Sequence, residues 1–177
     1  MPTRDDIALL AAYNASMNRK VYAAAATLPH DVLAEDRGAF FGSVLGTLNH
    51  ILCGDTIWLR RFAAHPASFA SLREIASIPA PSGLRHSYGD DLQTLLALRL
   101  HLDAIITALA ADVSNEDLQQ PLSYTNYQGV QRKNFGSLLL HFFNHQTHHR
   151  GQASTLLTQA GADIGVTDLL ELIPTAR

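Results

Sequence analysis

The sequence predicts an all-α fold, a four-helix bundle formed by a single domain over residues 1–177. Three observations lead to this prediction. The chain is 47% hydrophobic and rich in Ala and Leu, which favour helix. Four long segments place apolar residues at alternating steps of three and four, the spacing that lines one face of an α-helix. A chain of 177 residues can also bury a sizeable core without disulfides, and this one has a single cysteine.

Charge and composition limit the partners that the chain can have. The net charge is −3 and the basic residues form no cluster, so a nucleic-acid partner is not expected. The lone Cys53 fits a reducing cytoplasm. The first residues lack the apolar core of a signal peptide, and no stretch is predicted to span a membrane. We therefore expect a cytoplasmic protein that contacts neither nucleic acid nor membrane.

The first helix is predicted to begin after Thr3 and to end near Pro29. Thr3 and Asp6 have the spacing of a capping box, in which two side chains satisfy free backbone N–H groups at a helix start. Asn14 interrupts the apolar stripe of this helix. We interpret Asn14 as a buried residue that makes structural hydrogen bonds.

The second helix is predicted from about Ser43 to about Ala64. Every fourth residue of one face is a glycine or a histidine, in the order Gly42, Gly46, His50 and Gly54. Each glycine inside a helix costs about 1 kcal/mol relative to Ala. Either a neighbouring helix approaches closely, or space is left beside His50 for water or substrate. His50 is a candidate metal ligand. Cys53, one turn further on, is either a rival thiolate ligand or a small buried side chain.

The connection from 65 to 87 contains three prolines and is too long for a tight turn. Such a stretch can cross the length of a helix, so the third helix is expected to run parallel to the second. A short helical turn is expected after Ser71. The third helix is predicted from a Ser87 cap, with Asp90 three residues later, to about Ala111. Its almost wholly apolar stripe predicts packing rather than ligands.

Residues 121–133 alternate Tyr and Thr around Gly129, which predicts a small β-hairpin before the fourth helix. The fourth helix is predicted from about Asn134 to Ala160, with Gly161 as the residue that ends it. The apolar tail at 164–173 is expected to pack back as a last helical turn.

Four of the nine histidines lie in the fourth helix, between His141 and His149. His145 and His149 are one turn apart on its core-facing stripe, so both rings can reach one metal ion. Gln146 follows the first of the pair where a metalloprotease of this motif has a glutamate base, so that class is excluded. The alternative is a pair of hydrogen-bonded core histidines. His148 is predicted to flank the site, and His141, one turn before His145, is either a further ligand or a residue at the rim of the site.

Segments from three of the four helices together resemble the DinB family, in particular its YfiT-like metal-dependent members. The matching segments are Tyr13-Asn14 to Asn18, Leu48-Asn49-His50-Ile51 with Asp55 and Trp58, and His145 with His149-Arg150-Gly151-Gln152. The resemblance implies an up-down-down-up four-helix bundle that forms a homodimer. It also implies that His50, His145 and His149 bind one divalent metal ion.

Three neutral histidines would leave part of the coordination sphere open, which is typical of a catalytic site. Such ligands suit zinc or nickel first, with iron, manganese or copper as further possibilities. The resemblance implies a small-molecule substrate such as a low-molecular-weight thiol, hence a metal-dependent thiol transferase or hydrolase. Two alternatives stay open at this point. One is a non-catalytic metal-binding stress-response bundle, and the other is a metal-free core network of histidines.

Overall fold

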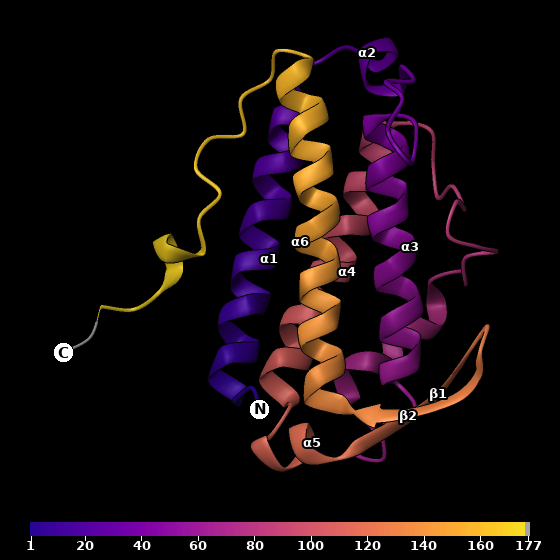
Figure 1. Cartoon of the computed structure of the whole chain (residues 1–177), viewed down its shortest axis with the longest axis vertical. Coiled ribbons are helices and arrows are strands. Elements are labelled where there is room, and N and C mark those ends of the chain that lie inside the picture. Colours follow the sequence, from indigo (N-terminus) through magenta and orange to yellow (C-terminus); the bar gives the residue numbers. More distant parts are fainter. Residues whose placement is uncertain (176–177) are drawn as a thin grey trace.

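The computed structural model describes residues 1–175 and is mostly helical, as predicted for an all-α protein. Four long helices stand side by side along the long axis of the molecule (Figure 1). They are α1 (Arg4–Ala25), α3 (Val44–Phe62), α4 (Leu92–Asp112) and α6 (Phe135–Gln159). α1 packs against α4 and α6, and α3 packs against the same two helices. The four therefore enclose one shared core.

The core is apolar and closely packed between the four helices. Phe62 of α3 meets Phe135 and Phe142 of α6 edge-on, with ring centroids 5.4 and 5.6 Å apart. All three rings are fully buried. Burial of side chains of this size is worth roughly 1.5–3 kcal/mol each, so these contacts fix α6 against α3.

Most helix starts lie where the sequence predicts them. Thr3 and Asp6 form the expected capping box of α1. The Ser43 side chain accepts a hydrogen bond from the Gly46 N–H at the start of α3, and Asn134 caps α6 in the same way. These caps satisfy backbone N–H groups that have no partner inside the helix.

The predicted start of α4 is wrong by four residues. Ser87 does not cap this helix, because its hydroxyl donates instead to the Gly89 carbonyl. Asp91 is the capping residue, and its carboxylate accepts from the N–H and hydroxyl of Thr94.

Several short elements connect the long helices. The sequence did not predict α2 (His30–Ala34) or α5 (Asn115–Gln119). The expected turn after Ser71 lies inside a 3₁₀ helix, η1 (Ala70–Ser77). The C-terminal tail contains a second such turn, η2 (Leu169–Leu172).

The predicted hairpin is present and leads directly into α6. Strands β1 (Pro121–Asn126) and β2 (Gly129–Asn134) are antiparallel, with Asn126 opposite Gly129 across a two-residue turn. Gly129 has φ +96°, a conformation that favours glycine. The hairpin lies across the end of the bundle where α6 begins (Figure 1).

One expectation about membranes needs correction. α4 contains an 18-residue window of mean hydropathy 1.6, so it is long and apolar enough to span a membrane. The core helix of a water-soluble bundle passes the same test. Here α4 packs against α1 and α3, and it carries the buried charged residues Arg99 and Asp103.

Candidate metal site

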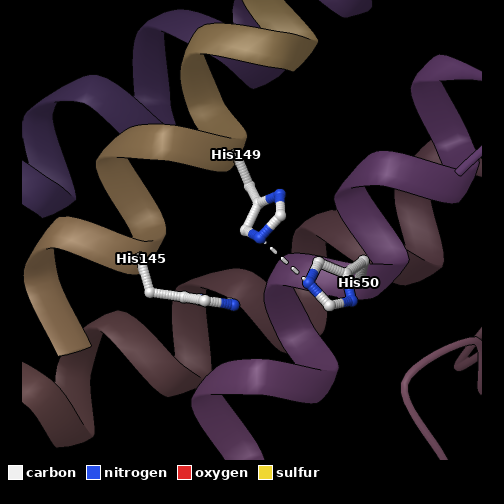
Figure 2. A group of neighbouring side chains, drawn as sticks. All are labelled: His50, His145 and His149. Carbon is white, nitrogen blue, oxygen red and sulfur yellow. Dashed lines mark hydrogen bonds between the residues drawn. The ribbon is translucent and has the colours of Figure 1, made fainter. Parts of the chain in front are cut away.

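Three histidines from two helices converge on one point between α3 and α6. His50 comes from α3, and His145 and His149 come from successive turns of α6 (Figure 2). Each offers one ring nitrogen, and the three nitrogens all lie within 4.8 Å of one another. His50 is buried, while the other two are half-buried. This cluster could hold a metal ion.

Two of the rings are oriented by oxygen atoms behind them. Nδ1 of His50 lies 3.0 Å from the Leu84 carbonyl, and Nδ1 of His149 lies 2.7 Å from Oε1 of Gln152. A carbonyl oxygen only accepts, so each Nδ1 carries the ring proton. The two Nε2 atoms then hold lone pairs, and they face each other 3.1 Å apart. Lone pairs turned towards one another are the arrangement that a bound cation satisfies, so the donor set fits a metal.

The electrostatics of the cluster keep the rings neutral, which is the form that binds metals. Burial, followed by the neighbouring His149 and His50 rings, lowers the pKa of His145 to about 3. Burial also lowers the pKa of His50 and of His149. Nδ1 of His145 is buried and has no hydrogen-bond partner among residues 1–175.

The loop before α3 covers one side of the cluster. The Phe41 ring stacks on His50, with centroids 3.8 Å apart and planes 16° apart, and meets His149 edge-on. Arg85 lies over the Phe41 ring and donates to the Phe40 carbonyl at 2.7 Å. Sequence reasoning missed Phe41. The only signal was the aromatic pair Phe40-Phe41, which Gly42 separates from the predicted helix start at Ser43.

The glycines of α3 are explained by close approach, the first of the two predicted reasons. A Cβ at Gly54 would lie 2.6 Å from Cε1 of His145, so Gly54 makes room for this ring. A Cβ at Gly46 would collide with the carbonyl oxygen of Phe41. Gly42 lies before the helix, with φ +77°. The glycine pattern therefore serves the α3–α6 contact and the covering loop.

The other candidate ligands lie outside the cluster. His141 packs against Trp58 with ring centroids 5.0 Å apart, and its ring lies 6.2 Å from that of His145. His148 is exposed beside His149. Cys53 is fully buried, and its thiol donates to the His86 carbonyl. Burial raises the pKa of this thiol to about 11. Of the two interpretations of Cys53, a thiolate ligand or a small buried side chain, the structure therefore favours the second.

A buried polar network holds α3, α4 and α6 together beneath the histidines. Asp55 accepts from Arg99 at 2.5 Å and from Gln146, the neighbour of His145, at 2.8 Å. Nη2 of Arg99 also lies 3.0 Å from an Asp103 oxygen, an ionic contact that is not aligned as a hydrogen bond.

The network continues into α1 through amide side chains. Asn14 donates to Asp103 and accepts from Arg150, which confirms its predicted role as a structural hydrogen bonder. Asn18 donates to the same Asp103 oxygen at 2.9 Å. Buried charged groups are paired or hydrogen-bonded in proteins. Arg99 is paired with Asp55 and Asp103, Arg150 is hydrogen-bonded to neutral groups, and the network links all four long helices.

Comparison with known proteins agrees with the resemblance in the sequence. The chain matches the DinB family over residues 1–176. It is 26% identical to Protein DinB of Bacillus subtilis (strain 168) over 158 residues, which is 88% of this chain and 87% of that protein. It is 39% identical to the uncharacterized protein YrdA of the same strain, over 35% of each chain. No solved structure matches the chain. The match along essentially the whole chain shows that the protein belongs to the DinB family.

Proposed function

We propose that this protein is a metal-dependent enzyme that binds one divalent ion through His50, His145 and His149. The observation that carries the proposal is the pair of Nε2 atoms, 3.1 Å apart, whose protons are held on the far side of each ring by Leu84 and Gln152. Zinc or nickel suits such imidazole ligands best, and iron, manganese and copper are also compatible.

The proposed reaction is transfer to, or hydrolysis of, a small molecule, with a low-molecular-weight thiol as the first substrate class to test. A metal held by three imidazoles would lower the pKa of a bound water or thiol and so supply a nucleophile near neutral pH. The chain's own contribution is to hold three neutral rings in place and to cover one side of them with Phe41. Neutral ligands leave the ion's charge uncompensated, which favours an anionic nucleophile.

The test begins with metal content, measured by mass spectrometry on protein purified without an affinity tag. About one ion per chain is expected, together with a melting temperature that falls on chelation. Assays of thiol transfer and ester hydrolysis on the loaded protein follow. Stoichiometric metal without either activity would support a non-catalytic metal-binding bundle. No metal after reconstitution would reduce the histidines to core residues and refute the proposal.

We also infer the up-down-down-up order of the long helices and a homodimer, as the family resemblance implies. The connection between Phe62 and Leu92 supports the helix order, because it can return along the roughly 28 Å length of the 19-residue α3. Light scattering after size-exclusion chromatography tests the dimer. A monomer at micromolar concentration would contradict it.

Gly54→Ala is expected to weaken metal binding by about 10- to 100-fold, the range typical of changes beside a metal ligand. The added methyl group overlaps the His145 ring, which must turn away from the other two histidines. Because the ring is the free end of a side chain, the free energy of unfolding of the metal-free protein changes little. Metal titration and thermal melting measure the two effects separately.

Gly151→Ala is the matched control, since a Cβ there meets no atom within 4 Å. This variant gains about 1 kcal/mol of helix propensity and leaves the metal affinity unaltered. Equal metal affinity in the two variants would show that the His145 ring does not depend on the space at Gly54.

A further inference from the structure

A cavity lies on the side of α6 that is turned away from the histidines. It has a volume of about 350 Å³ and lies between α1, α6 and the chain segment 163–167. Ser154 lines it and is nine residues after His145, which is about 180° around the helix. Figure 1 shows the C-terminal segment leaving α6 and running back beside α1. The cavity is therefore separate from the proposed metal site.

The cavity contains a buried cation whose direct partners are neutral. Arg150 is only 5% exposed. Its guanidinium donates to the Asn14 side-chain oxygen and, at 3.2 Å, to the Thr147 hydroxyl, and it lies 5.6 Å from the centre of the Tyr13 ring. No carboxylate oxygen of residues 1–175 lies within 4 Å of it. A buried charge with neutral partners attracts a counter-ion.

A second cation lies at the rim of the cavity. Lys20 Nζ lies 3.0 Å from a Glu171 carboxylate oxygen and 2.5 Å from the Val166 carbonyl. The Tyr13 hydroxyl donates to the Thr167 carbonyl at 2.7 Å and fastens the same segment. The C-terminal segment thus pairs its Glu171 carboxylate with Lys20, which lines the cavity.

The remaining lining mixes polar groups with the apolar side chains of Met17, Val21 and Ile164. Hydroxyl groups come from Thr147, Ser154 and Thr158, and Gly151 adds no side chain. The one acidic lining residue, Asp163, accepts the Gly165 N–H at 2.8 Å and closes its own turn. The cavity therefore combines two cations and several hydroxyl groups with one carboxylate that is already engaged.

We propose that this cavity binds a small anion, a phosphate or carboxylate group, anchored by Arg150 and assisted by Lys20. Guanidinium binds both groups through paired N–H donors. Glu171 competes with the anion for Lys20, so binding of the anion and docking of the C-terminal segment oppose each other at that lysine. The site is independent of the metal, and its ligand is either a free phosphate or the carboxylate of a small metabolite.

The test is calorimetric titration of the full chain with inorganic phosphate and, separately, with succinate. Lys20→Gln is expected to weaken binding about two- to fivefold, as for loss of one exposed charge contact. Glu171→Gln is expected to tighten it by a similar factor, because Lys20 is released. The two variants break the same ion pair but are expected to change the anion affinity in opposite directions. A general loss of stability would not produce this result.

Gly151→Glu is the decisive variant, because Arg150 itself supports the fold. The new carboxylate enters open space at the cavity and is expected to abolish anion binding, whereas Gly151→Gln retains part of it. Lys133→Gln removes one positive charge from the exposed hairpin and serves as the control for a change in net charge. His145→Ala tests whether the anion binds through the metal, and it is expected to leave anion binding unchanged. Absence of binding to either anion, or binding unchanged by Gly151→Glu, would overturn the proposal. The relative affinities identify which anion the cavity prefers.

Discussion

His145→Ala is expected to lower the affinity for a divalent metal by more than about 100-fold, beyond the effect of changes beside a ligand. His145 lies between His141 and His149 on α6, and it is the ring against which Gly54 of α3 packs. Its removal leaves one imidazole from each helix, so the ion loses the pair on α6 that fixes its position. The measurement is the stoichiometry and affinity of zinc and nickel for the purified variant.

Two neighbouring histidines provide controls of the same chemistry. His148→Ala removes an exposed imidazole next to His149, and His141→Ala removes one that packs against Trp58. Both variants are expected to keep about one ion per chain. If either lost its metal as His145→Ala does, the ligand set would differ from the proposed one. If all three kept it, the three-histidine cluster would not be the binding site.

The sequence could predict that two of the three candidate ligands lie together on α6, because their spacing is local. His145 and His149 are one helical turn apart. The glycines on the same helix face as His50 predicted either close approach of a neighbouring helix or open space beside this histidine. The groups that orient the rings were harder to foresee. Leu84 contributes a backbone carbonyl from a long connection, and a carbonyl has no signature in the sequence. Phe41 reaches His50 through the path of a loop rather than through a periodic pattern.

The buried network was missed for a different reason. Arg99 and Asp103 lie four residues apart on α4, between Leu95 and Ile106, so they share the apolar stripe of that helix. Charged residues inside such a stripe are a signal of a buried ion pair. The partner Asp55 lies 44 residues earlier, and only the packing of α3 against α4 brings the two together. The residue pattern of one helix therefore predicts that a charged residue is buried, but it does not predict which distant residue pairs with it.

Asp55→Ala is expected to lower the free energy of unfolding by about 3–5 kcal/mol, the range for removing one partner of a buried ion pair. Asp55 is fully buried, and its two oxygens accept from Arg99 and Gln146. Burial raises the pKa of its carboxyl to about 6, and the neighbouring Arg99 charge opposes the rise. The variant leaves the Arg99 charge with Asp103 alone, and urea unfolding measures the loss.

Two controls separate burial from simple loss of an ion pair. Glu35→Ala breaks the Arg37 contact at 2.6 Å, but the glutamate side chain is 59% exposed, so the expected loss is below about 1 kcal/mol. In the double variant Asp55→Leu with Arg99→Met, apolar side chains replace both charges, and most of the stability is expected to return. A double variant as unstable as Asp55→Ala would show that Asp103, left without its cation, carries the larger share of the network's energy.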